Sequence, residues 1–227
     1  MSTDSRLRRT LSRHYWSFLD FLRLTPWPWH KLSHMERGGF STLHVAELLE
    51  KQGICILENY LTHDQVVLYQ ELVDRLIKDL ERKAPSPRNA YNPIIDITEH
   101  TVFADLVLDE FILTCVEAYY GRPVYLCCAR GGRIYPKEPC EYGAFRWHHD
   151  TKGKWVKAMW LLTDVPSTGQ RMSYIPGSHK LRHPWDATPE QTRFTREQAL
   201  AYGEILECAA PAGSVIIFDQ YCPNVLK

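Results

Sequence analysis

The stretch "FRWHHDTKGKW", residues 145–155, holds two adjacent histidines and an aspartate between aromatic residues. Side chains two residues apart on a β-strand point to the same face, so on a strand His148 and Asp150 project together while His149 points away. Alternatively, the run is a polar turn between two strands, because a histidine and an aspartate at this spacing are common in unrelated proteins.

On a strand, this pair supplies two of the three protein ligands of a facial triad. Such a triad of two histidines and one carboxylate holds non-haem Fe(II) and leaves coordination positions open for substrate and oxygen. Zn²⁺ also accepts histidine and aspartate ligands, but no motif around the pair supplies the general base of a zinc hydrolase. From this stretch alone, an iron site with His148 and Asp150 as ligands, a zinc site and a polar turn all remain open.

The composition is that of a globular protein. The chain has 227 residues, 44% of them apolar, and its formal net charge of zero indicates neither a nucleic-acid surface nor an acidic partner. Its seven cysteines form no C-x-x-C pair, so we predict reduced, mostly buried thiols and a cytoplasmic location. No apolar stretch is long enough to span a bilayer, and the N-terminus lacks the apolar region of a secretory signal.

The chain divides into an N-terminal helical extension with its connector, residues 1–42, and one domain over residues 43–227. In the extension, "LRRTLSRHYWSFLDFLRL" places apolar residues near one helical face. It is either a membrane-surface helix or, as we favour, a helix docked on its own domain, because tryptophans commonly complete a core.

The domain begins with helices and continues with short β-rich runs. Thr62 and Gln65 form a capping box at the start of a long helix, and residues 103–121 form a second helix that ends at a glycine. The β-rich runs begin with residues 123–135. Helices followed by strands predict an α+β class in which helices brace a β-sandwich or barrel.

Further elements follow the histidine–aspartate pair in a recognisable order. They are Trp160 on the next strand, Asp164 at its end, Gly169 in a turn, and "IPGSH" at residues 175–179. In these elements the sequence resembles the phytanoyl-CoA hydroxylase (phytanoyl-CoA dioxygenase) family of Fe(II)- and 2-oxoglutarate-dependent oxygenases. The resemblance covers roughly residues 43 to 224. It implies a double-stranded β-helix, the jelly-roll barrel of cupin-like proteins.

The resemblance also implies cofactors and a site. Fe(II) would be bound by His148, Asp150 and a distal histidine, with 2-oxoglutarate as co-substrate. Trp160 would line the co-substrate pocket, and a core tryptophan beside Met159 is the alternative. The reaction would oxidise an unactivated C–H bond of a small organic substrate while 2-oxoglutarate is decarboxylated.

Other polar residues have two interpretations each. Arg130, Arg133 and Arg146 would either meet an acidic substrate or form surface charges. His179 is expected to fix a loop rather than to bind metal. The insertion over residues 181–202 is expected to cover the substrate.

One part of the family pattern is missing. The distal histidine should fall at Asn224, and an arginine for the far carboxylate of 2-oxoglutarate should follow, but the chain ends at Lys227. We interpret the chain as a C-terminally shortened oxygenase with impaired turnover, because an amide oxygen is a poor substitute for imidazole on Fe(II). The alternatives are a pseudoenzyme that binds a small molecule, and a site completed by Asn224 itself or by another residue such as His183.

Overall fold

The computed structural model describes residues 34–83, 93–134, 146–149, 155–168, 170–180 and 193–226. The helices are α2 (Thr42–Gln52), α3 (His63–Lys83), α4 (Ala104–Val107), α5 (Glu110–Tyr120) and α6 (Arg196–Leu200), with 3₁₀ turns at Thr101–Phe103 and Ser178–Lys180. The strands are β1 (Glu36–Arg37), β2 (Phe40–Ser41), β3 (Ile54–Leu57), β4 (Ile94–Asp96), β5 (Arg130–Gly132), β6 (Trp147–His148), β7 (Val156–Trp160), β8 (Met172–Tyr174), β9 (Arg193–Phe194), β10 (Leu206–Cys208), β11 (Val215–Asp219) and β12 (Asn224–Leu226). Most of the predicted extension, residues 1–42, lies outside the described residues, so the domain boundary stays a prediction.

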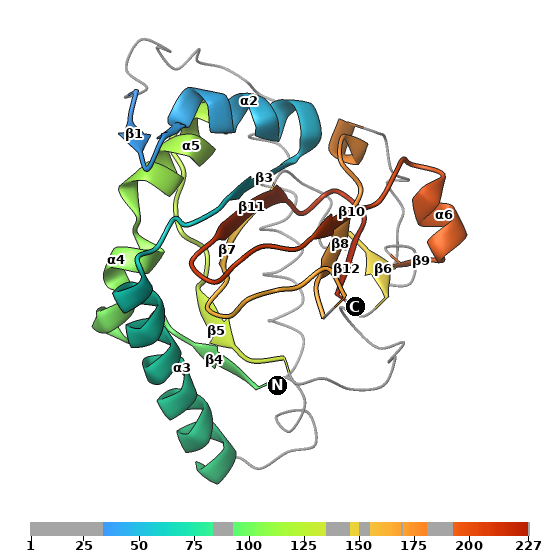
Figure 1. The fold of residues 1–227 in the computed structure, drawn as a ribbon. Helices are drawn as coiled ribbons and strands as arrows, with labels where there is room; N and C mark the ends of the chain where they lie inside the picture. Colours follow the sequence, from blue (N-terminus) through green and yellow to red (C-terminus); the bar gives the residue numbers. More distant parts are fainter. Residues whose placement is uncertain are drawn as a thin grey trace, which may run out of the picture. The chain divides into compact units, whose positions relative to one another are not determined.

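A three-stranded antiparallel sheet in the order β3-β11-β7 lies between the helices and a second sheet. Helices α2, α3 and α5 cover one of its faces (Figure 1). The buried strand β11 alternates between two cores, with Val215 and Ile217 toward the helices and Ile216 and Phe218 toward the second sheet. A strand covered on both faces has a continuous apolar sequence, which explains why this segment shows no polar alternation.

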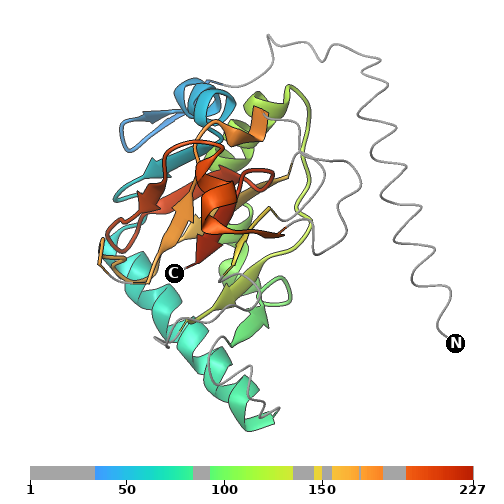
Figure 2. The same cartoon turned by 90° about the vertical axis from the view of Figure 1, so that its right-hand side faces the viewer.

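A five-stranded antiparallel sheet in the order β10-β8-β12-β6-β9 packs on the other face of β11. Side chains of both sheets form one apolar cluster, which includes Ile54, Phe218, Met172, Tyr174 and Cys208. The outer face of the five-stranded sheet carries a separate cluster of Trp147, Ile175, Ala199 and Val225. Figure 2 views the molecule from the side of α6, which follows β9 at the edge of this sheet. The architecture is therefore α+β, as the order of helices and strands predicts.

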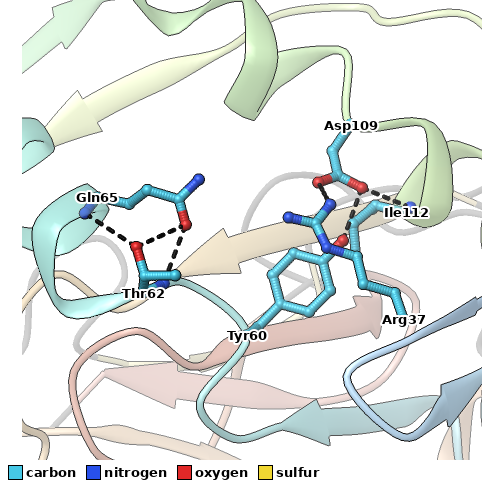
Figure 3. Close-up of polar contacts among 6 residues, drawn as sticks. All are labelled: Arg37, Tyr60, Thr62, Gln65, Asp109 and Ile112. Atoms are coloured by element: carbon cyan, nitrogen blue, oxygen red, sulfur yellow. Dashed lines mark hydrogen bonds and ion pairs between the residues drawn. The ribbon is translucent and has the colours of Figure 1, made fainter.

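The long helix α3 begins at the predicted capping box (Figure 3). The backbone N–H of Gln65 donates to Thr62 Oγ1 at 3.3 Å, and the backbone N–H of Thr62 donates to Gln65 Oε1 at 2.9 Å. Each side chain thus satisfies a backbone donor that no helical carbonyl can reach. The sequence motif is confirmed as the start of the helix.

The predicted single helix over residues 103–121 is wrong, because the chain leaves the helical conformation at Asp109, between α4 and α5. The buried carboxylate of Asp109 accepts a hydrogen bond from the Ile112 backbone N–H at 3.0 Å and another from the Tyr60 hydroxyl at 2.7 Å. Arg37 forms an ion pair with the same carboxylate (Figure 3). An aspartate stabilises a helix more as its N-cap than in its interior, so Asp109 begins α5 instead of continuing α4.

The predicted β-run over residues 123–135 is also mostly wrong. Of its described residues, only Arg130–Gly132 form a strand, which pairs with β4. The side chains of Tyr125, Leu126, Cys127 and Cys128 are exposed. Strand preference mainly reflects the fit of a side chain to a half-buried pleated surface, and this segment lies on no such surface in the described structure.

Two predictions from composition agree with the described residues. Of the six cysteines described, all are free, and Cys55, Cys115, Cys208 and Cys222 are buried. Burial raises the pKa of Cys55 and Cys222 to about 11 and that of Cys115 and Cys208 to about 12, so these thiols are inert near neutral pH. Among the described helices, none has both the length and the apolar character that crossing a membrane requires.

Candidate functional site

One row of side chains runs across the five-stranded sheet at the position of the predicted site. The strand register places in it, in spatial order, Leu206, Tyr174, Asn224, His148 and Arg193. Directly opposite residues of antiparallel strands share one face of the sheet. Tyr174 belongs to the cluster between the two sheets, so this row, called the His148 row below, lies on the face that looks toward the three-stranded sheet.

His148 is buried, with 5% of its surface exposed. Its Nδ1 lies 2.7 Å from the carbonyl oxygen of Arg146. Because a carbonyl only accepts hydrogen bonds, Nδ1 carries the proton and Nε2 is the ring nitrogen with a lone pair. This is the tautomer that a histidine has when Nε2 binds a metal and a hydrogen bond orients the ring.

The neighbouring histidine has different surroundings. His149 follows the end of β6, is 2% exposed and contacts the ring of Tyr221 with centroids 5.5 Å apart. Trp147, which precedes His148, packs in the outer cluster on the face opposite to that of His148. Asp150, the second predicted metal ligand, lies outside the described residues. The structure therefore places one member of the predicted metal pair.

Asn224 lies directly opposite His148 and is also buried, with 6% of its surface exposed. Its Nδ2 donates to the carbonyl oxygen of Cys222 at 3.0 Å, which leaves Oδ1 as the acceptor of the amide. Opposite residues of an antiparallel pair have Cβ atoms about 4.5–5.5 Å apart, close enough for both side chains to bind one ion. The residue at the position expected for the distal histidine is therefore beside His148, and it offers an oxygen atom.

His148 and Asn224 meet some, but not all, of the requirements for a bound metal. The tautomer and burial of His148 suit a metal ligand, whereas Asn224 supplies a neutral oxygen where an iron triad has a second imidazole. Within the described ranges, no group of three or more histidine, cysteine, aspartate or glutamate side chains is arranged to hold a metal ion. The described donors alone thus do not complete a facial triad.

A buried polar network fixes the turn that leads into β12. Asp219, at the end of β11, is 1% exposed, and its carboxylate accepts hydrogen bonds from the Tyr119 hydroxyl and the Tyr221 backbone N–H, both at 2.8 Å. The Tyr174 hydroxyl lies 2.7 Å from the Gly53 carbonyl oxygen and 3.0 Å from that of Asp219. Burial and the Asp219 carboxylate raise the pKa of Tyr119, so it remains a neutral donor. The network joins α5, β8 and the end of β11 to Gly53, which lies between α2 and β3.

Trp160, predicted to line the co-substrate pocket, packs partly buried against the helix-side core. The preceding residue, Met159, packs against the cluster between the sheets. Trp160 therefore lies on the face of β7 that is turned away from the His148 row, and its buried Nε1 has no hydrogen-bond partner among the described residues. This placement favours the alternative role in the core, and the role in co-substrate binding stays a prediction.

The turn at residues 175–179 attaches the end of β8 to α2. His179 Nε2 lies 3.1 Å from the Glu50 carbonyl oxygen, and the Gly177 backbone N–H donates to the Gln52 carbonyl oxygen at 2.7 Å. Both contacts attach the turn to the last residues of α2. Burial lowers the pKa of His179. These contacts agree with the loop-fixing role expected for this histidine.

The placement of the three arginines that the sequence analysis named favours the surface-charge interpretation. Arg133 forms an ion pair with Asp74 at 2.5 Å, and Arg130 and Arg146 are exposed. Arg193, which the sequence analysis did not single out, lies in the His148 row. No local signal marks it, because its position depends on the pairing of two short strands that lie far apart in the sequence.

Comparisons with known proteins identify the relatives of this fold. A family model described as phytanoyl-CoA dioxygenase (PhyH) matches residues 49–223. No curated protein sequence matches the chain significantly.

Several solved structures are similar in fold. The non-heme alpha-ketoglutarate-dependent carbocyclase SnoK from nogalamycin biosynthesis has a TM-score of 0.63 at 17% identity, with 81% of this chain and 77% of that chain covered. HygX from Streptomyces hygroscopicus, solved with nickel and 2-oxoglutarate bound, has a TM-score of 0.58 at 17% identity, with 86% and 81% covered. EctD from S. alaskensis, in its apoform, has a TM-score of 0.59 at 20% identity, with 89% and 75% covered.

Proposed function

The chain belongs to the phytanoyl-CoA dioxygenase family of Fe/2-oxoglutarate oxygenases, and from this premise we propose that it oxidises an unactivated C–H bond of a small organic substrate with Fe(II) and 2-oxoglutarate. The observation that carries the proposal is His148. It is a buried imidazole on the face between the sheets, and its hydrogen bond to the Arg146 carbonyl gives Nε2 the lone pair with which a histidine binds a metal.

We also propose how the two sheets described above are arranged. The five-stranded and three-stranded sheets form the two walls of a double-stranded β-helix, and the His148 row lies on the inner side of one wall. The shared apolar cluster between the sheets supports this arrangement, because the inner faces of two such walls form a common core.

In the proposed site, His148 and Asp150 bind the metal. Iron and 2-oxoglutarate, when bound, would activate O2, with one oxygen atom going to succinate as 2-oxoglutarate loses carbon dioxide and the other oxidising the substrate C–H bond. The chain contributes a fixed ring orientation through the Arg146 carbonyl. The apolar cluster between the sheets contributes surroundings that exclude water from the reacting groups.

Asn224 favours a second candidate function, a catalytically inactive member that binds a small molecule. A neutral amide oxygen at the third ligand position holds Fe(II) less well than an imidazole, so we expect impaired turnover whichever function the protein has. The two candidates differ in whether any turnover depends on His148.

The test is succinate formation from 2-oxoglutarate under air, with Fe(II) and ascorbate, by the 227-residue chain, by His148→Ala and by Asn224→His. We expect little succinate from the unchanged chain and more from Asn224→His. Strong succinate production by the unchanged chain that disappears in His148→Ala would contradict the impairment. If Asn224→His binds iron but remains inactive, the inactive binding protein is the better assignment.

A further inference from the structure

Arg193 lies at the end of the His148 row, on strand β9. The register pairs it directly with His148, and Trp147 pairs with Phe194 in the same ladder. Trp147 packs in the outer cluster, so His148 and its partner Arg193 lie on the opposite face, toward the three-stranded sheet. An arginine from the segment that follows residues 181–192 is therefore adjacent to the imidazole of the proposed metal site.

We propose that Arg193 binds the carboxylate of an anionic organic ligand whose reacting end is held at His148. This inference rests on the proposed function only because it takes the His148 row as the ligand pocket. The other members of the row besides His148, namely Leu206, Tyr174 and Asn224, are neutral, so the Arg193 guanidinium is the permanent charge of the row.

Arg193 is partly buried as a residue, and its guanidinium has no ion-pair or hydrogen-bond partner in the part of the chain that the structure describes. Two other partly buried arginines differ in this respect, since Arg171 pairs with Glu207 at 2.8 Å and Arg133 pairs with Asp74. A charge that loses part of its hydration without a partner costs free energy, which an anionic ligand would offset.

The chemistry of the guanidinium selects the ligand class. Its planar array of donors matches the two oxygens of a carboxylate, and such bidentate pairs are stronger than neutral hydrogen bonds. Opposite residues have Cβ atoms about 4.5–5.5 Å apart, and the arginine side chain is long, so one ligand can contact both Arg193 and a group held at His148. The carboxylate belongs either to 2-oxoglutarate or to the organic substrate.

The experiment measures carboxylate binding by calorimetry on the 227-residue chain. The probes are 2-oxoglutarate, and hexanoate added to protein already saturated with 2-oxoglutarate. The variants are Arg193→Gln, which removes the charge, and Arg193→Lys, which keeps the charge but loses the bidentate geometry. Arg196→Gln is the matched control, because Arg196 is exposed, lies three residues further on and carries the same charge. Circular dichroism melts establish whether each variant is folded. If Arg193→Gln does not fold, the binding data for Arg193→Lys decide the test.

We expect Arg193→Gln to weaken one probe by roughly ten- to a hundredfold, Arg193→Lys to weaken it less, and Arg196→Gln to leave it unchanged. A loss for 2-oxoglutarate assigns the site to the co-substrate, and a loss confined to hexanoate assigns it to the substrate. The proposal is overturned if neither probe binds the unchanged chain, or if Arg193→Gln behaves like Arg196→Gln. A parallel Mn(II) titration separates this failure from that of the proposed function, which fails if Mn(II) binding does not depend on His148.

Discussion

Asn224 on β12 lies directly opposite His148 on β6, and both side chains are buried on the face between the two sheets. The Asp219 network immediately before β12 fixes the turn that produces this register. Residue 224 therefore decides which donor atom lies beside the imidazole on this face of the sheet.

Replacing Asn224 with histidine should tighten metal binding. The change adds an imidazole beside His148, and even changes in the outer shell of a metal site alter affinity by roughly tenfold or more. The measurement is the Mn(II) dissociation constant by calorimetry, supported by electron paramagnetic resonance. Asn224→Ala is the control, since it removes the amide and adds no ligand. Equal tightening in both variants would show that the new imidazole does not bind the metal.

The two adjacent histidines should have separable roles. His148→Ala should abolish Mn(II) binding, because it removes the ring whose Nε2 carries the lone pair proposed to bind the metal. His149→Ala should leave Mn(II) affinity within about twofold but lower stability by about 2 kcal/mol or more, because it deletes a fully buried ring packed on Tyr221. Mn(II) titration and urea unfolding of both variants test this. A comparable loss of Mn(II) binding in the two variants would refute the assignment of strand faces.

Trp160→Phe should leave 2-oxoglutarate affinity unchanged while it lowers stability. The side chain packs on the helix-side core, so the smaller ring loses contacts there, at a cost of about 0.5–3 kcal/mol. Calorimetry on the Mn(II)-loaded protein and urea unfolding measure the two effects. The control is Trp155→Phe, at a tryptophan that is 45% exposed. A clear loss of 2-oxoglutarate affinity at unchanged stability would instead establish the predicted co-substrate contact.

Removing the Tyr119 hydroxyl should destabilise the fold. Tyr119→Phe leaves one oxygen of the buried Asp219 carboxylate without its side-chain donor, which should cost about 1.5–3 kcal/mol in the free energy of unfolding. Urea unfolding measures the difference. Tyr125→Phe is the matched control, because that side chain is 68% exposed and its substitution should change stability by less than about 0.5 kcal/mol. A similar small effect at Tyr119 would mean that this hydrogen bond contributes little.

His179 should make stability depend on pH. Burial lowers its pKa below the ordinary value of 6.5, so between the two values the unfolded chain binds more protons than the folded one. Stability therefore falls as the pH drops below 6.5 toward the lowered pKa, and this contribution is constant at higher pH. His179→Gln retains a donor for the Glu50 carbonyl but does not titrate, so its stability should fall less over that window. Urea unfolding across the window tests this, with the exposed His44→Gln as control. An unchanged pH dependence in His179→Gln would contradict it.

The sequence by itself determined the features that depend on residues close together in the chain. The capping box of Thr62 and Gln65 was predictable because both partners lie within one helical turn. The helix-then-strand order indicated the α+β class, and strand alternation gave the expectation that His148 and His149 point to opposite faces. Counting along the last strand, with the family pattern as guide, put the position of the distal histidine at Asn224. The structure pairs this residue with His148.

The tertiary structure alone decided what depends on distant contacts. Asp109 ends one helix and begins the next because its carboxylate also meets Tyr60 and Arg37, which come from other parts of the chain. The face on which Trp160 packs cannot be deduced from a strand that is covered on both sides. Arg193 lies beside His148 because two short strands pair in one register, and a shift of one residue would turn its side chain to the opposite face. Strand pairing of this kind is set by packing across the whole sheet, which no local pattern in the sequence records.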